Sequence, residues 1–228
     1  MHRGLFTLDS KPIPGLKYNP MMLLHGEEKV LFSKPLSTGE TYIMHEEITD
    51  ISDKKSGGLI VLQTKVYEKS TNDQVALVES NIFIRGIGGF GYKGTLRENL
   101  SRPKTPSEAS VEAPMAPNAA FLYRMNGDRN PLHVDPKMAK IGKFDRPILH
   151  GLCTYAMSVR AVQKKYSNDD PNALESVNAR FTSHVFPGET LIVDMWKEGN
   201  KITFMTKTKE RGKVACIGYV KIKPQAKL

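Results

Sequence analysis

One short polar loop carries the side chains that are best suited to move protons. Asp128 and His133 lie five residues apart, and Pro131 restricts the backbone between them, so both side chains can converge on a small volume. An aspartate and a histidine in that arrangement form a general acid–base pair. Asn130 stands between them, and its amide can both donate and accept hydrogen bonds, so it can orient a water or a carbonyl. Each residue alone would be a turn residue; their combination favours chemistry.

A helix start follows this loop. His150-Gly151 opens a pattern of apolar residues at i, i+3 and i+4 spacings, which predicts a helix over residues 151–166. The first N–H groups of a helix have no intrahelical partner, and the helix dipole favours negative charge there. The Gly151 N–H can therefore stabilise an oxyanion. An acid–base pair beside such a helix end suits proton transfer next to a carbonyl.

The elements that position these groups indicate an α+β fold for the C-terminal half, residues 119–228. A short helix is expected over residues 119–125, ending at Asn126-Gly127, and one turn of helix over residues 137–140. After the long helix, runs of β-branched and aromatic residues between turn residues predict four strands, at 176–185, 190–197, 201–209 and 214–222. An antiparallel sheet would wrap its apolar face around the long helix.

The N-terminal half, residues 1–92, is expected to consist mostly of strands. Partial alternation of apolar and polar residues predicts strands at 42–52, 59–68 and 76–85, which can form an antiparallel meander. Residues 93–118 contain four prolines and few large apolar side chains. We therefore interpret them as a linker between the two halves.

The composition excludes several classes of protein. Hydrophobic residues make up 39% and charged residues 25% of the 228 residues, which is typical of a globular chain. No apolar run approaches the ~20 residues of a membrane-spanning helix, and the first residues lack the apolar stretch of a signal peptide. No membrane association is therefore expected. Two cysteines cannot form a disulfide framework, so a reducing compartment is expected. The net charge of +9 favours an anionic partner, such as a phosphorylated cofactor.

Three other patterns are not expected to carry the functions they resemble. Residues 86–91 match G-x-G-x-x-G, but a proline-rich segment follows in place of a crossover helix, so a dinucleotide site is not expected. His133, Asp135 and His150 could bind a metal, yet their spacing matches no zinc motif, so no metal is expected. The basic residues are scattered, with no recognition helix or aromatic ladder among them, so nucleic-acid binding is not expected.

The stretch from Tyr123 to Thr154 resembles the signature of the MaoC-like, (R)-specific enoyl-CoA hydratases, the hydratase 2 family. That signature is usually written Y-R-x-S-G-D-x-N-P-L-H-x-D-P followed by P-I-L-H-G-L-C-T, and the one change inside its core is Asn126, where serine is usual. The N-terminal half resembles the eukaryotic, peroxisomal form of the family in three runs, at residues 18–27, 53–54 and 88–91.

This resemblance implies a double hotdog fold, in which each half is a sheet curled around a helix and the two sheets join side by side. In eukaryotic members the second half is catalytic, and the first half has lost its central helix, which admits long acyl chains. Such proteins usually carry several dozen more residues ahead of the region of Leu5-Phe6-Thr7. We therefore expect the N-terminal half to be shortened at its start.

The resemblance also assigns residue roles. The catalytic Asp and His of the family correspond to Asp128 and His133, with His133 as base and Asp128 as acid. The substrate-orienting Asn and the backbone donor to the thioester oxygen correspond to Asn130 and Gly151. Substrate and coenzyme A contacts are expected at His25, Gly26, Lys54, Arg129 and Phe181. The implied reaction is the reversible syn hydration of a trans-2-enoyl-CoA to the (3R)-3-hydroxyacyl-CoA. It needs no metal, flavin or nicotinamide, because adding water changes no oxidation state.

The expected partners are a second copy of the chain and an import receptor. A homodimer is expected because hotdog proteins tend to bury sheet edges. The final Ala226-Lys227-Leu228 is a close variant of the S-K-L address, so we expect recognition by the peroxisomal import receptor and a place in fatty-acid β-oxidation. Two alternatives stay open: a hotdog dehydratase or thioesterase that acts on acyl carrier protein, and a non-catalytic acyl-CoA binder.

Overall fold

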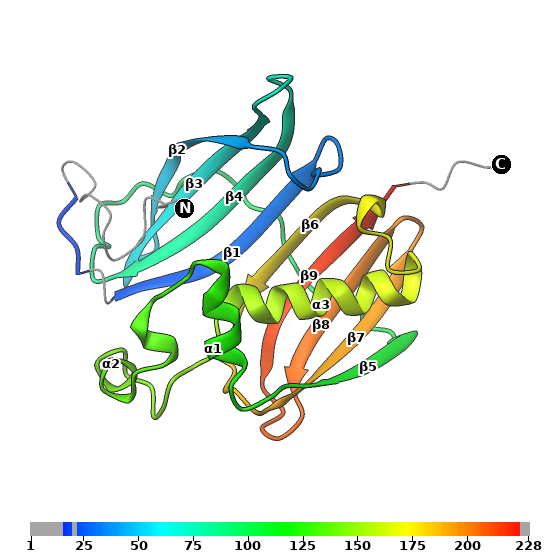
Figure 1. Cartoon of the computed structure of the whole chain (residues 1–228). Helices are drawn as coiled ribbons and strands as arrows, with labels where there is room; N and C mark the ends of the chain where they lie inside the picture. The colour runs from blue at the N-terminus through cyan, green and yellow to red at the C-terminus, as the bar shows by residue number, and fades with distance from the viewer. Residues whose placement is uncertain (1–15, 20–21, 224–228) are drawn as a thin grey trace.

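Nine strands hydrogen-bond into one continuous antiparallel sheet in the computed structural model, which describes residues 16–19 and 22–223. The strand order is β2-β3-β4-β1-β6-β9-β8-β7-β5. Figure 1 shows two curved sections that meet along β1 and β6. The strands are β1 (Leu23–Phe32), β2 (Tyr42–Asp53), β3 (Gly57–Glu68), β4 (Gln74–Arg85), β5 (Ala109–Pro114), β6 (Leu174–Phe181), β7 (Thr190–Glu198), β8 (Lys201–Thr208) and β9 (Val214–Ile222).

The junction between the two sections is the antiparallel pairing of β1 with β6, in which Val30 lies opposite Val177. β1 was not among the strands predicted from the sequence. Its centre carries Glu27, Glu28 and Lys29, which have the composition of a solvent-exposed stretch. In the structure both glutamates are buried at the junction. A charged run therefore forms one of the central strands, because it lies where the two sections meet.

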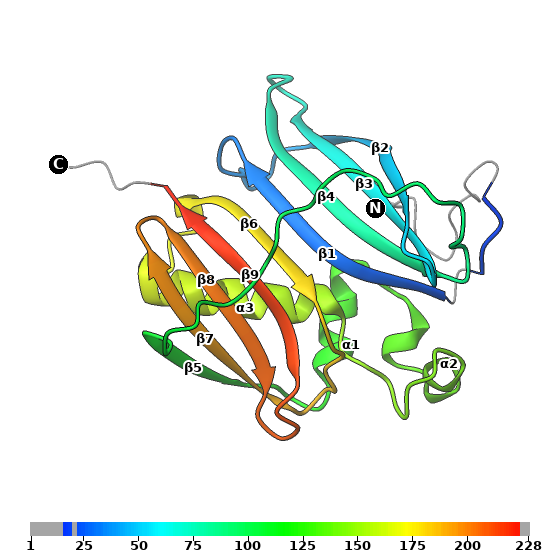
Figure 2. The same ribbon diagram turned by 180° about the vertical axis from the view of Figure 1, so that it is seen from behind.

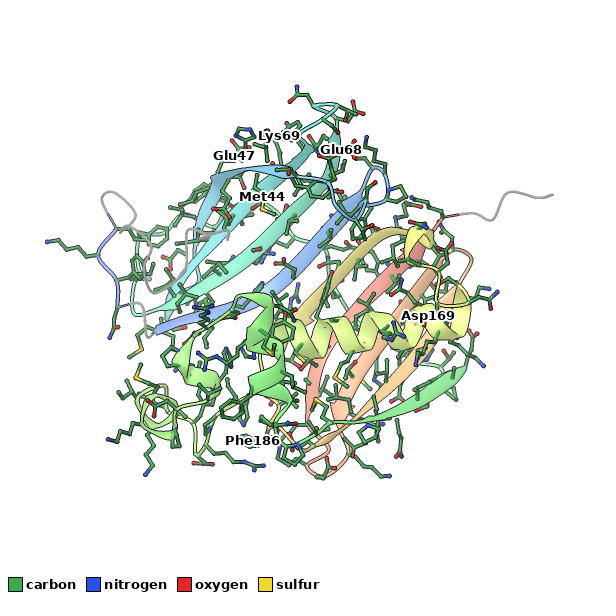
Figure 3. All side chains as sticks on the ribbon, viewed as in Figure 1. Met44, Glu47, Glu68, Lys69, Asp169 and Phe186 are labelled. Carbon is green, nitrogen blue, oxygen red and sulfur yellow. The ribbon has the colours of Figure 1, made fainter. Side chains whose placement is uncertain are left out.

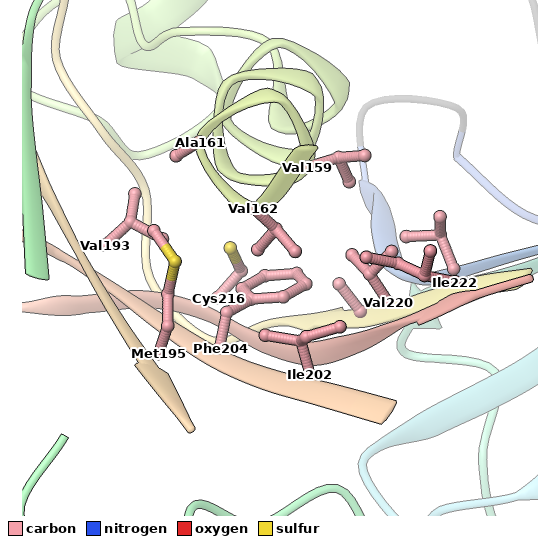
Figure 4. Packing of buried hydrophobic residues seen from close by; sticks show 12 residues of the cluster. Val159, Ala161, Val162, Val193, Met195, Ile202, Phe204, Cys216, Val220 and Ile222 are labelled. Atoms are coloured by element: carbon pink, nitrogen blue, oxygen red, sulfur yellow. The ribbon is translucent and has the colours of Figure 1, made fainter. Parts of the chain in front are cut away.

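The helix α3 (Gly151–Tyr166) crosses one face of the C-terminal section and supplies its core. Its buried residues include Val159 and Val162, at the spacing of one helix face. They share an apolar cluster with Phe204 and Cys216 of the sheet, and Figure 4 shows these side chains between helix and strands. The predicted helix over residues 151–166 is confirmed at both ends.

Short helices lie beside the N-terminal end of α3, as Figure 1 shows. The helix predicted over residues 119–125 is confirmed as a short α-helix continued by a 3-10 turn, and it ends at Gly127 with a φ of 117°. The Asp135 carboxylate accepts a hydrogen bond from the Lys137 N–H at 2.7 Å and starts the next helix. The short helices are α1 (Ala119–Tyr123), η2 (Arg124–Asn126), η3 (Pro131–His133), α2 (Pro136–Ile141) and, after α3, η4 (Pro171–Ala173).

The segment at residues 93–118 crosses the back of the sheet before the chain reaches α1, as Figure 2 shows. Glu98 anchors it, since its carboxylate accepts from the Tyr219 hydroxyl at 3.0 Å and its carbonyl from Arg180 at 3.2 Å. The prediction that the whole segment is a linker is wrong for β5, which pairs with β7. Among the described residues β5 has no neighbour on its other side, so its terminal Pro114 is tolerated there.

The strands of the N-terminal section follow the predicted meander, with bounds within two residues of those expected. Ile60, Ile82 and Ile84 form an apolar cluster against which Leu16 and Tyr18 pack. Over residues 16–19 and 22–92 the structure contains no helix equivalent to α3, as the resemblance implied. Within the described ranges, no helix combines the length and apolar character that crossing a membrane requires.

Candidate active site

His133 occupies the end of η3 in a geometry that suits a base. His133 is only 9% exposed, and its Nδ1–H donates a hydrogen bond to the Ile148 carbonyl at 2.8 Å. That bond fixes the tautomer, because a nitrogen facing a carbonyl must carry the proton. The lone pair therefore stands on Nε2. Burial lowers the pKa of His133, which keeps the ring neutral and able to accept a proton.

Asp128 lies beside this ring with a side chain that is 49% exposed. Its Oδ1 accepts the Asn130 N–H at 3.1 Å, which closes the turn that the sequence predicted. One of its carboxyl oxygens lies within 4.8 Å of a ring nitrogen of His133 and of one of His150. The two predicted proton-transfer groups are thus brought to one place.

His150 connects the two catalytic candidates. Its ring stacks on the His133 ring, with centroids 3.7 Å apart and an angle of 27° between the ring planes. The centroid of the Tyr123 ring lies 4.7 Å from that of His150, with an angle of 43° between the planes. Its Nε2–H donates to the Asp128 carbonyl at 3.3 Å. Burial, with the neighbouring His133, lowers the pKa of His150 to about 4. His150 is therefore a neutral ring that holds the Asp128 loop against His133.

Asn130 is placed between these groups, but part of its amide is already engaged. Its Oδ1 accepts the Leu132 N–H at 3.0 Å and begins η3. The side-chain NH₂ group remains to donate to a bound oxygen. The structure therefore favours a donor role toward a water or carbonyl over the combined donor and acceptor role that the sequence allowed.

Gly151 is the first residue of α3, so its N–H is one of those that the helix leaves unpaired. The Phe181 ring lies 3.5 Å from the position that a Cβ would occupy there. His25 in turn contacts Phe181 edge to face, with ring centroids 5.1 Å apart. A donor at the positive end of a helix, lined by aromatic rings, is suited to hold a carbonyl oxygen that gains negative charge.

The same residues also form the one metal-type cluster found in the described ranges. Donor atoms of Asp128, His133 and His150 all lie within 4.8 Å of one another. Two rings stacked at 3.7 Å and 27° cannot both direct an in-plane lone pair at an ion about 2 Å from each nitrogen. The geometry favours proton transfer over metal binding.

Known proteins share both the sequence pattern and this architecture. The family described as MaoC like domain matches residues 98–216, and the MFE-2 hydratase 2 N-terminal domain matches residues 5–86. The peroxisomal enoyl-CoA hydratase 2 of Arabidopsis thaliana is 38% identical, over 96% of this chain and 76% of its own length. The probable enoyl-CoA hydratase 2 of Dictyostelium discoideum is 41% identical, over 89% of this chain and 70% of its own. The chain belongs to the MaoC-like hydratase 2 family.

Solved structures agree with this placement. A MaoC-like dehydratase from Phytophthora capsici superposes with a TM-score of 0.88 at 35% identity, over 96% of this chain and 75% of that one. The full-length peroxisomal multifunctional enzyme type 2 of Drosophila melanogaster gives 0.82 at 36% identity, and this chain spans 37% of it. A Mycobacterium tuberculosis protein with a double hotdog fold gives 0.59 at 12% identity, which concerns the fold alone. The double hotdog prediction is confirmed.

The residues expected to contact substrate in this hydratase 2 chain divide into two groups. His25, Gly26 and Phe181 gather at the junction of β1 and β6, where Gly26 is the extra residue of a bulge. Lys54 follows β2, three strands from β1, or about 14 Å at ~4.8 Å per strand. Arg129 is exposed beside Asp128. Their roles stay predictions, and Ala226, Lys227 and Leu228 lie outside the described residues.

Two residues of the site were not singled out from the sequence. Tyr123 and His150 both stand inside the hydratase 2 signature, which was the available signal. The sequence analysis considered His150 as the residue before a helix and as a possible metal ligand, but not as a partner of Asp128 and His133. Its contact with the Asp128 carbonyl joins positions 22 residues apart, so spacing alone did not reveal it.

Proposed function

We propose that this chain catalyses the reversible syn hydration of a trans-2-enoyl-CoA to the (3R)-3-hydroxyacyl-CoA, as a hydro-lyase. The observation that carries the proposal is the His133 geometry. Its Nδ1–H is tied to the Ile148 carbonyl, its Nε2 is free as a base, and Asp128 lies beside it. Membership of the hydratase 2 family supports the substrate class and the R stereochemistry.

The residues divide the reaction as follows. A water held by Asp128, Asn130 and His133 loses a proton to Nε2 of His133 as its oxygen bonds to C3. The electron pair of the double bond shifts toward the thioester carbonyl, whose oxygen the Gly151 N–H stabilises. The carboxyl proton of Asp128 then passes to C2. One water is added in total, and proton exchange with solvent restores both catalytic groups.

His150 is a positioning residue in this scheme. It stays neutral because burial lowers its pKa to about 4, so it places no positive charge against the base. Its hydrogen bond to the Asp128 carbonyl holds the acid-bearing loop in place. The neutral stacked ring also excludes water from one face of His133.

Coenzyme A binding is proposed at the remaining predicted residues. Lys54 is an exposed cation suited to a phosphate, and Arg129 is an exposed cation beside the catalytic loop. Phe181 lies next to Gly151, where the thioester end of the substrate has to sit, and His25, which precedes Gly26, contacts the Phe181 ring. The net charge of +9 suits a polyanionic substrate of this kind.

A turnover assay tests the proposal. Loss of the enoyl thioester absorbance is followed with crotonyl-CoA and with a long-chain trans-2-enoyl-CoA, and with the same acyl groups on acyl carrier protein. We expect hydration of the coenzyme A substrates. Turnover restricted to carrier-protein substrates would favour the dehydratase alternative, and binding without turnover would favour an acyl-CoA binder.

We also propose a peroxisomal location and a homodimer. The location rests on relatives whose names place them in peroxisomes, and the receptor would recognise Ala226-Lys227-Leu228. An N-terminal fluorescent fusion should give peroxisomal puncta that become diffuse when Lys227 and Leu228 are deleted. The dimer rests on the two outer strands, β2 and β5, which end the sheet. Light scattering at the mass of one chain across micromolar concentrations would exclude the dimer.

A further inference from the structure

A buried hydroxyl without a partner stands next to the proposed oxyanion donor. Tyr155 lies on α3 four residues after Gly151, so both residues share one helix face. Its hydroxyl is buried, and no hydrogen-bond partner for it exists in the part of the chain that the structure describes. Burial raises the pKa of Tyr155, so the hydroxyl keeps its proton. Buried polar groups normally have partners, so this one is suited to a group that enters from outside.

A buried carboxylate from the other half of the molecule faces the same region. Glu28 on β1 is 8% exposed. One of its oxygens, Oε2, accepts from the Ser80 hydroxyl at 2.6 Å and from the His25 ring at 2.9 Å. Its second oxygen, Oε1, makes no bond to any described residue. Across the sheet Glu28 lies opposite Ala179 of β6, which belongs to the apolar cluster against which Tyr155 packs, so Glu28 and Tyr155 face the same region.

These two groups lie on the acyl side of the proposed thioester position. His25 joins Glu28 to the Phe181 ring, and Phe181 covers Gly151. The coenzyme A part of a substrate is large and charged, so it has to extend toward solvent. An acyl chain whose carbonyl is held by Gly151 therefore takes the buried direction, toward Tyr155 and Glu28.

We propose that Tyr155 and Glu28 form a polar subsite that binds a hydroxyl group carried on the acyl chain of the substrate. One alcohol satisfies both protein groups, because its oxygen accepts from the Tyr155 hydroxyl and its proton is donated to Oε1 of Glu28. This inference rests on the proposed hydratase function and names a substrate class for it: enoyl-CoA thioesters with a hydroxylated chain.

The test compares trans-2-decenoyl-CoA with a set of its monohydroxylated isomers, in which the hydroxyl moves along the saturated part of the chain. The measured quantity is the ratio of kcat/KM for each isomer to that for the plain chain, so general losses of activity cancel. In the wild-type protein one isomer should be preferred. Tyr155→Phe and Glu28→Gln should each lower that preference by about tenfold, the effect of one well-made hydrogen bond.

One matched control is Tyr166→Phe, at the opposite end of the same helix, where the half-buried ring lies under the Lys197 ammonium. The other is Glu47→Gln on β2, a residue that Figure 3 labels. Both controls should keep the wild-type ratio. Thermal melting establishes that each variant is folded. Equal ratios for all isomers in the wild-type protein would overturn the subsite. Ratios that Tyr155→Phe and Glu28→Gln leave unchanged would overturn it too, and would indicate that a water alone bridges the two groups. If the plain chain is hydrated in that case, the proposed function stands; if no substrate is hydrated, the proposed function itself has failed.

Discussion

Replacing Gly151 by proline removes the proposed oxyanion donor and leaves the helix able to form. Gly151 is the first residue of α3, where proline is favoured because the missing N–H has no helical partner. The residue before a proline needs an extended ψ of about +120° to +160°. His150 already has a ψ of 133°, so the substitution requires no change of backbone.

The magnitude follows from the single donor that is lost. Removing one oxyanion-hole donor costs about 2.7–4 kcal/mol in the transition state, or roughly 10²–10³ in kcat. Gly151→Ala is the matched control, since it keeps the N–H and its Cβ would lie 3.5 Å from the Phe181 ring, an ordinary contact. We expect Gly151→Ala to keep much more activity than Gly151→Pro.

The assay is steady-state hydration of crotonyl-CoA, with kcat and KM determined separately, alongside thermal melting of each variant. We expect a melting temperature close to that of the wild type for Gly151→Pro, with the loss mainly in kcat. Retention of more than about a tenth of kcat by a folded Gly151→Pro variant would refute the oxyanion role. A collapsed melting temperature would instead refute the assignment of Gly151 to the first turn of the helix.

Three further predictions concern the base, the pH response and the core. Asp128→Asn and His133→Gln should each lower kcat by a factor of about 10²–10⁴. The control Asp169→Asn, just beyond the far end of α3 (Figure 3), should keep the wild-type kcat. A near-normal kcat for both Asp128→Asn and His133→Gln would exclude acid–base roles. Burial lowers the pKa of His133 and His150, so below pH 6.5 the unfolded chain binds more protons than the folded chain does. The contribution of these two residues to the free energy of unfolding should be full above that pH and fall toward about pH 4. A free energy of unfolding in urea that is independent of pH over this window would contradict the prediction. Phe204→Ala should lower the free energy of unfolding by about 3–5 kcal/mol, because Phe204 is fully buried under α3. A decrease of less than about 1 kcal/mol, measured by urea unfolding, would argue against that packing.

Local patterns predicted much of the C-terminal half. The apolar spacing of residues 151–166 is long and regular, and Gly127 marks the end of the preceding helix, so both features could be placed from sequence. β1 could not, because burial of Glu27 and Glu28 depends on the β1–β6 pairing of strands about 150 residues apart. β5 was missed because its Pro114 is tolerated only at a sheet edge, and the sequence does not state which strand lies there.

The candidate site shows the same division. Asp128, Asn130 and His133 are neighbours in the chain, so one loop was enough to propose that they act together. The tautomer of His133 depends on the Ile148 carbonyl, and the place of the loop depends on His150. Both contacts join positions separated by a helix and a turn, so they follow from the tertiary structure alone.

The stereochemistry of the hydration product shows whether His133 and Asp128 act as the catalytic pair of an (R)-specific hydratase. Wild-type protein is incubated with a trans-2-enoyl-CoA, and the 3-hydroxyacyl product is resolved by chiral chromatography, with His133→Gln as the inactive control. We expect the 3R enantiomer from the wild type and no product above background from the variant. A 3S product, or equal product from both proteins, would contradict the assignment of His133 and Asp128 as the catalytic pair.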